Sequence, residues 1–305
     1  MTEKNFDLPG IVAVAAVLLG CIFWGGGYTG NLVVWMAIAA LMAASLRFVL
    51  LIGELNFASA AFFGIGAYCT GYVVNTLQWP FFATLALSAA LALVVSIAFG
   101  CITLKVKGPY FLLIGFAFTE AMRILYTRTD ALGGNSGLVG IFPPAWLDAH
   151  YQYLATVLCF ALILGLLAIE RSHLGRIFVA IRDNDYVVRS VGNRVFVAKV
   201  VCFAIASAVA GLAGSLHAFA NNVISPLDFG FMLSTFALAY LKVGGEDSPL
   251  GPVVGAVLLV GVASWAQSLG GSEHILYGAA IVLSVLFMPK GLMGLLHRFR
   301  HGGGR

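Results

Sequence analysis

Charged residues gather in one stretch of this sequence, residues 171–194, and are scarce in the apolar runs on either side of it. The stretch reads RSHLGRIFVAIRDNDYVVRSVGNR. It is too charged to cross a bilayer and too long to be a tight turn between two helices. Its mixture of charged and apolar residues suits docking to a second molecule rather than the making or breaking of bonds. We therefore expect an exposed amphipathic segment on which a soluble partner acts.

A few other ionisable residues could do chemistry, and each also has a structural interpretation. Glu120 and Arg123 are three residues apart, so they can meet on one helix face, as an ion pair or as a contact for a solute. His217 stands alone in an apolar run, which is typical of a packed histidine, because a proton relay would need carboxylates beside it. Arg47 and Glu54 flank one end of an apolar run, and we expect both at the membrane interface.

Catalytic and metal-binding patterns are missing from the sequence. It contains no zinc-protease helix motif, no GxSxG and no Walker lysine loop. Gly64-Ile-Gly66 lacks the preceding strand that a dinucleotide site requires. The five cysteines lie inside apolar runs and form no CxxC, so we interpret them as small buried hydrophobes. We expect a chain that is not an enzyme, binds no metal or cofactor of its own and hydrolyses no ATP itself.

Composition places these residues in a membrane protein. The chain is 61% apolar and 10% charged, whereas soluble domains contain roughly 45–50% apolar and about 25% charged residues. Apolar runs long enough to cross a bilayer recur along the whole length, which predicts an all-α polytopic membrane protein with about ten transmembrane helices. The predicted spans are 10–24, 30–52, 57–77, 81–104, 109–125, 151–170, 196–220, 229–243, 253–270 and 274–289.

The basic residues predict the orientation. With ten spans and both ends of the chain on one side, 15 of the 17 lysines and arginines fall on that side, and only Arg123 and Arg128 fall opposite. Basic residues concentrate on the cytoplasmic side, so we expect both termini to be cytoplasmic. A nucleic-acid-binding patch is disfavoured, because neither a soluble domain nor an aromatic stacking platform accompanies the charge.

Glycine-rich blocks allow two interpretations, close helix packing or a lining for a translocation path. The block around 53–71 makes the third span a candidate for a broken or re-entrant helix, which is tolerated only inside protein. The second block, around 244–261, includes the GxxxG of Gly251 and Gly255. The longest loop on the other side, 126–150, is rich in turn residues and is either a docking surface or a connector.

Within 171–194 we expect one short helix over about 183–190 that ends near Gly192. Asp183 or Asn184 would cap its first turn. Such a helix would expose one apolar and one charged face. It would suit a groove on a cytoplasmic partner, and the alternative is a helix that lies on lipid headgroups.

Short motifs occur in a fixed order over about residues 40–296. They are LNFASAAFFGIGAY at 55–68, KGPYF at 107–111 with Glu120 and Arg123, the 175–192 segment, AGLAGSLHA at 210–218, GG with LGPVVGA in 244–256, LYG at 276–278 and PKGL at 289–292. Together they resemble the membrane permeases of ABC importers for branched-chain amino acids, the LivM-type subunits. The chain departs from the family pattern with Asp185 for Glu, Val187-Val188 for Ala-Ala, residues 246–249 for Gly-x-Gly, and Asn135-Ser136 where an acidic residue is common. The last departure leaves the cargo open.

The resemblance implies a transmembrane permease domain over residues 1–296 and a short basic cytoplasmic tail over 297–305, in the bacterial inner membrane. The implied partners are a second homologous permease subunit, two cytoplasmic ABC ATPases that hold the ATP and Mg, an external solute-binding protein and membrane lipid, with no nucleic acid. The implied coupling residues are Gly175, Arg176, Arg182, Asp183, Asn184, Asp185 and Gly192. The candidates for a translocation path or for close packing are Gly64, Gly66, Tyr68, Glu120, Gly244, Gly245, Gly251 and Gly255.

Three functions remain open on the sequence. The first is the importer permease, for branched-chain amino acids or for urea, amides or aromatic acids. The second is an ion-coupled secondary transporter or channel, which needs an ion site near the membrane midplane that the sequence does not show. The third is a membrane scaffold that transports nothing and would tolerate changes in 171–194.

Overall fold

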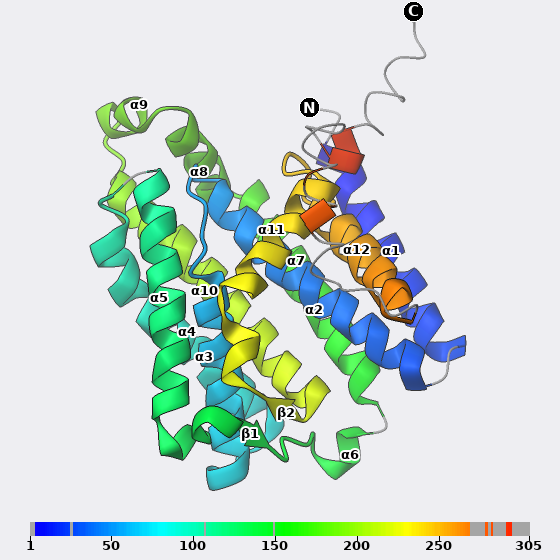
Figure 1. Ribbon diagram of the computed structural model, residues 1–305. Helices are drawn as coiled ribbons and strands as arrows, with labels where there is room; N and C mark the ends of the chain where they lie inside the picture. Colours follow the sequence, from blue (N-terminus) through cyan, green and yellow to red (C-terminus); the bar gives the residue numbers. More distant parts are fainter. Residues whose placement is uncertain are drawn as a thin grey trace, which may run out of the picture. The chain divides into compact units, whose positions relative to one another are not determined.

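The computed structural model describes residues 4–24, 27–106, 108–148 and 150–268, and a few later positions at 278–279, 282 and 291–294 (Figure 1). The chain divides into two compact units. Unit 1 contains Met1–Arg47, Gln152–Leu164 and Phe236–Arg305, and unit 2 contains Phe48–Tyr151 and Gly165–Thr235. Long helices therefore contribute to more than one unit.

Helices overlie nine of the ten predicted spans in the described residues. They are α1 (Lys4–Trp24), α2 (Gly27–Leu50), α3 (Ser59–Tyr72), α4 (Phe81–Thr103), α5 (Pro109–Arg128), α7 (Tyr151–Arg171), α10 (Val195–Asn221), α11 (Phe231–Gly244) and α12 (Gly251–Ser268). Five of them, α2, α4, α5, α7 and α10, are long and apolar enough to cross a membrane. The prediction of an all-α polytopic membrane protein is confirmed. The tenth span, 274–289, lies largely outside the described residues, so the count of ten and the side of the termini stay predictions.

Unit 2 is built around the contact between α3 and α10. A Cβ on Gly66 would collide with the carbonyl of Gly211, and a Cβ on Gly214 would collide with the carbonyl of Phe63. The absence of side chains at these positions lets the two backbones approach, as small residues do between helices in lipid. Buried hydroxyls reinforce the contact, because Thr70 Oγ1 lies within hydrogen-bond distance of the hydroxyls of Ser88 on α4 and Ser215 on α10.

In the connector of residues 51–58, between α2 and α3, side chains satisfy backbone groups just before α3 begins. The carbonyl of Phe57 accepts hydrogen bonds from the hydroxyls of Thr119 and Ser234, both at 2.9 Å. The amide of Ala58 donates to Asn56 Oδ1 at 2.9 Å. Irregular backbone at membrane depth is tolerated only when protein groups satisfy it in this way. Gly115 on α5 lacks the Cβ that would strike Ala58.

The third span is helical throughout Ser59–Leu77, although the sequence allowed a broken or re-entrant helix. The α3 helix continues directly as a π-helix over Val73–Leu77. The segment ends at Gln78, whose φ of 52° is left-handed. Its irregularity therefore lies in the π turn and in the connector that precedes it, and the glycines inside it serve close packing.

Two different structures occupy opposite ends of unit 2 (Figure 1). One end carries α8 (His173–Asp183) and α9 (Asp185–Ser190). The other carries β1 (Leu138–Val139), which pairs antiparallel with β2 (Val223–Ile224) in the register Leu138 opposite Ile224. Short helical turns, Asp130–Leu132, Gly134–Ser136, α6 (Ala145–Asp148) and Pro226–Phe229, complete this end. The turn-rich loop is therefore tied to the end of α10 by a small sheet.

Unit 1 contains a second close helix contact, between α11 and α12. A Cβ on Gly255 would collide with the carbonyl of Tyr240, and one on Gly244 would collide with the carbonyl of Gly251. Arg47 lies beside this corner, with Nε donating to the carbonyl of Glu246 at 3.0 Å. The Arg47 side chain is buried in the protein, and its position at the membrane interface stays a prediction. Carbonyls after the last turn of a helix lack helical partners and attract a guanidinium.

The α3–α10 contact predicts a specific sensitivity to added volume. Gly66→Val should lower the free energy of unfolding by about 1–3 kcal/mol, because the side chain would meet backbone that cannot move aside. Gly165→Val on α7 is the matched control, since nothing lies within 4 Å of a Cβ at that position. Thermal unfolding of the purified variants in detergent measures both. Equal midpoints for the two variants would contradict the packing described for α3.

Candidate functional site

The α8–α9 element, residues 173–190, is amphipathic. It packs around a small apolar cluster that it shares with the start of α10. Ile181 of α8, Val188 of α9 and Val195 at the start of α10 are buried together. Ile177 and Ala198 pack against this cluster. Most charged residues of the segment therefore face outwards from a defined structure, and Asp185 is the exception.

The junction between the two helices is Asn184. Its Oδ1 accepts hydrogen bonds from the amides of Tyr186 at 2.9 Å and Val187 at 3.4 Å. Of the two predicted caps, Asn184 is the one that the structure shows, and the predicted short helix is α9. Gly192, at φ 87°, takes the left-handed conformation after the helix, as its position predicts.

The α8 helix itself was missed, because only 183–190 was predicted to be helical. The missed signal is the spacing of Leu174, Phe178 and Ile181, which is typical of one helix face. Gly175, one of the implied coupling residues, lies buried inside α8. A Cβ there would collide with the backbone of Glu170, so Gly175 permits the sharp corner between α7 and α8.

A patch of exposed side chains surrounds α9, and we call it the α9 face. It consists of Arg182, Asp183, Tyr186, Val187, Arg189 and Val191. Tyr186 is 78% exposed and Val191 is 75% exposed. Large apolar side chains at such exposure, flanked by charges, are typical of a protein-binding or headgroup-binding surface. Among the other predicted coupling residues, Arg176, Asn184 and Gly192 are also exposed.

Asp185 points away from the α9 face and into the protein. Its Oδ2 lies 3.6 Å from Lys199 Nζ, and Glu54 Oε1 lies 3.6 Å from the same ammonium. The three side chains are between 5% and 9% exposed. The expected outward contact of Asp185 with a partner is therefore wrong, and the expected interfacial position of Glu54 stays a prediction. A buried ammonium draws both carboxylates inward, because an unpaired buried charge is costly.

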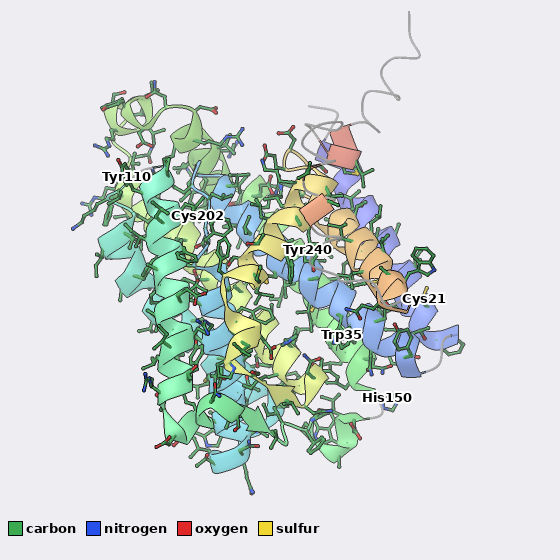
Figure 2. All side chains as sticks on the ribbon, viewed as in Figure 1. Cys21, Trp35, Tyr110, His150, Cys202 and Tyr240 are labelled. Atoms are coloured by element: carbon green, nitrogen blue, oxygen red, sulfur yellow. The ribbon has the colours of Figure 1, made fainter. Side chains whose placement is uncertain are left out.

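An apolar contact anchors α8 to the end of α2. The ring of Phe178 is fully buried and meets the ring of Phe48 edge to face, with centroids 5.9 Å apart. Beside it, Gly53 adopts φ 79° and lies against Arg182. Figure 2 labels Tyr110 at the start of α5 near the same end of unit 2. The α8–α9 element is therefore joined to the helices of unit 2 by both ring packing and ion pairs.

A second group of functional interest is an aromatic cluster toward the β1–β2 end of unit 2. It consists of Phe63, Tyr68, Tyr126, His217 and Phe229. Tyr68 and Tyr126 stack with centroids 4.1 Å apart. Both hydroxyls are buried, and neither has a hydrogen-bond partner among the described residues. Buried polar groups without partners are uncommon and indicate a bound ligand, water or strain.

Two predictions about ionisable residues near this cluster can be checked. Glu120 Oε2 accepts from Arg123 Nε at 2.7 Å, so the predicted ion pair is confirmed. Glu120 Oε1 also accepts from the amide of Phe231 at 3.1 Å, which ties α5 to the first turn of α11. His217 is a packed histidine, with Nε2 2.9 Å from Asn221 Nδ2 and its ring against Phe63. A solute contact at Glu120 stays a prediction.

The glycine candidates divide between the units. Gly64 and Gly66 belong to unit 2, where Gly64 lies against Tyr126 and Phe229. The other four belong to unit 1, where Gly245, at φ 110°, begins the turn between α11 and α12. At Gly66, Gly244, Gly251 and Gly255 a Cβ would strike backbone, so the geometry there is that of close packing. In the described part of the chain, no group of three or more histidine, cysteine or acidic side chains could hold a metal ion.

Comparison with known proteins agrees with this architecture. Residues 28–288 match the family model described as "Branched-chain amino acid transport system / permease component". The chain is 26% identical over 271 residues to the high-affinity branched-chain amino acid transport system permease protein LivM of Escherichia coli (strain K12), which covers 79% of this chain and 64% of the relative. The LivM protein of Salmonella typhimurium (strain LT2) gives the same values.

A more distant relative is the probable branched-chain amino acid transport permease protein LivM of Methanocaldococcus jannaschii. It is 24% identical over 228 residues, which cover 68% of this chain and 66% of the relative. No solved structure matches the chain significantly. The chain spans about 64% of the length of its two bacterial relatives. Its family match covers most of the chain, so this multi-pass membrane protein belongs to the branched-chain amino acid transport permease family.

Proposed function

We propose that this chain is a permease subunit of an ATP-driven importer in the bacterial inner membrane, with no ATPase activity of its own. The observation that carries this function is the α8–α9 element, an exposed helix pair fixed to the core of unit 2. A membrane protein that only conducts a solute has no need of a rigid, partly apolar surface at one end. An importer driven by separate ATPases requires one.

In this proposal the α9 face docks into a groove on a cytoplasmic ABC ATPase. Tyr186, Val187 and Val191 supply apolar contact, and Arg182 and Arg189 supply charge at the rim. Two ATPases would hold the ATP and Mg, and a second homologous permease subunit would complete the pore. Closure of the ATPases around ATP would move both α8–α9 elements and change the side on which the pore is open.

The opposite end of unit 2, with β1 and β2, would receive an external solute-binding protein. Basic residues support this orientation, because Arg171, Arg176, Arg182, Arg189 and Arg194 all belong to the α8–α9 end or its flanks. The relatives' names indicate branched-chain amino acids as cargo. Related small solutes such as urea, amides or aromatic acids are the alternatives, and the binding protein would select among them.

The aromatic cluster is the proposed contact for the solute in unit 2. Phe63 and Phe229 offer apolar surface, and the hydroxyls of Tyr68 and Tyr126 offer hydrogen bonds that nothing in the described residues uses. A branched-chain amino acid also combines an apolar side chain with a polar head group. Binding sites for such solutes pair apolar walls with a few convergent polar groups.

Removing contacts from the α9 face tests the coupling role. The double variant Tyr186→Ala/Val187→Ala should lower solute-stimulated ATP hydrolysis by the reconstituted importer roughly tenfold, since interface anchors contribute a large share of binding energy. Tyr110→Ala/Leu113→Ala on α5 is the matched control, because it removes equally exposed apolar side chains from another surface. Uptake that follows an ion gradient and needs no ATPase would contradict the proposal.

The two tyrosines give a separate test of the solute contact. Tyr68→Phe/Tyr126→Phe should raise the KM for uptake roughly tenfold, while the unfolding temperature stays unchanged or rises, because the lost hydroxyls have no protein partner. Tyr151→Phe is the control. It removes a hydroxyl that donates to the carbonyl of Leu216 at 2.6 Å, so it should lower stability by about 1 kcal/mol and leave KM unaltered. Wild-type KM in the double variant would show that the hydroxyls do not contact the solute.

A further inference from the structure

We propose that Lys199 is a positioning residue that transmits the movement of α9 to the connector of residues 51–58. This inference rests on the proposed function. The Lys199 ammonium lies 3.6 Å from Asp185, the first residue of α9, and 3.6 Å from Glu54, in the connector. One side chain on α10 thus joins the partner-binding helix to the irregular backbone of the connector.

The geometry indicates a shared ammonium rather than two completed bonds. Charge-assisted hydrogen bonds between an ammonium and a carboxylate are about 2.7–2.9 Å long. Both distances at Lys199 exceed that length by a similar amount. A small displacement of α9 toward or away from Lys199 would therefore close one of the two contacts at the expense of the other. Two discrete arrangements of this kind are what a conformational switch requires.

Burial makes the exchange energetically significant. The side chains of Glu54, Lys199 and Asp185 are at most 9% exposed, so water screens their charges weakly. Loss of one partner from a buried ion pair is strongly destabilising, because it leaves an uncompensated charge inside the protein. A movement of α9 that withdrew Asp185 would thus be opposed unless Lys199 moved closer to Glu54. The two acidic residues compete for one cation.

From Glu54 the effect can reach the centre of unit 2 through backbone contacts. Glu54 Oε2 accepts from the amide of Gly108, just before α5, at 3.3 Å. Three residues later, the carbonyl of Phe57 is held by Thr119 on α5 and Ser234 on α11. The connector includes Gly53, whose φ of 79° is open to few other residues. A shift at Glu54 would therefore act on the starts of α3 and α11 together.

The phenylalanine contact gives α8 a different role from α9. Phe178 is fully buried against Phe48, so α8 is fixed to the end of α2. Asn184 separates the two helices in an extended conformation. The ionic contact is the adjustable one, because the Lys199 ammonium can shift between the two carboxylates while Val188 keeps α9 packed against Ile181 and Val195. We therefore assign transmission to Lys199 and anchorage to Phe178.

The test uses a variant in which all three charges are removed together, Glu54→Gln/Asp185→Asn/Lys199→Met, so that no buried charge is left unpaired. The charge-conserving variant is Lys199→Arg. The matched control is Lys242→Met/Glu246→Gln, which removes a half-exposed ion pair from unit 1. Each is reconstituted with the ATPases and the binding protein, and its thermal unfolding, uptake and ATP hydrolysis are measured. Hydrogen exchange of segments 51–58 and 185–190 is recorded with and without trapped ATP.

We expect the neutral variant to assemble and to hydrolyse ATP at the unstimulated rate, with solute-stimulated hydrolysis and uptake reduced at least roughly tenfold. In the wild type and in Lys199→Arg, ATP should change exchange in both segments. In the neutral variant the change should be confined to 185–190. A purely structural role predicts instead that any neutral variant with normal stability keeps the response at 51–58.

The outcomes separate the two proposals. A wild-type complex without ATP-dependent uptake would reject the importer function itself. A wild type that transports, together with a neutral variant that transports equally well and keeps the ATP response at 51–58, would overturn the role of Lys199 alone. If the neutral variant fails to fold, Lys199→Met/Asp185→Asn is measured in its place. In that variant Glu54 still accepts from the amide of Gly108. Wild-type uptake in that variant also overturns the role of Lys199.

Discussion

The close backbone approach of α3 and α10 is the contact on which the rest of unit 2 depends. It exists because Gly66, Gly211 and Gly214 carry no side chain where the two helices meet. In a bilayer, helices gain little by hiding apolar surface from one another, so their association relies on such packing and on shared hydrogen bonds. The helix α10 carries the α8–α9 element at its first residues, and α3 follows the connector. Close contact of these two helices thus holds the α8–α9 element and the connector within one compact unit.

The two ends of unit 2 differ in the charge of their side chains. The α8–α9 element concentrates basic and exposed apolar side chains at one end of unit 2, and the β1–β2 pair closes the other. Between them, buried polar groups are used sparingly. The hydroxyls of Ser234 and Thr119 satisfy the connector, and Glu120 satisfies the start of α11. In the described residues, three buried hydroxyls have no such partner, those of Tyr68, Tyr126 and Ser207, and two of them belong to the aromatic cluster.

The helices that overlie the predicted spans, the α9 cap and the Glu120–Arg123 pair could be predicted from the sequence, because each depends on residues close together in the chain. Prediction failed where the outcome depends on distant partners. Nothing near Asp185 or Glu54 in the sequence shows that both turn inward to one lysine. Nothing near Gly175 in the sequence shows that its small size permits a corner against Glu170. The α8 helix is the avoidable miss, since the spacing of its apolar residues was visible.

The central claim is that the α9 face lies in the cytoplasm, where ATPases can bind it. A single cysteine at Val187, introduced after the five native cysteines are replaced, tests this directly with a membrane-impermeant thiol reagent. The account predicts no labelling in intact cells and full labelling in inverted membrane vesicles, because Val187 is 58% exposed. Labelling from outside intact cells would place the α9 face on the wrong side of the membrane and contradict the account.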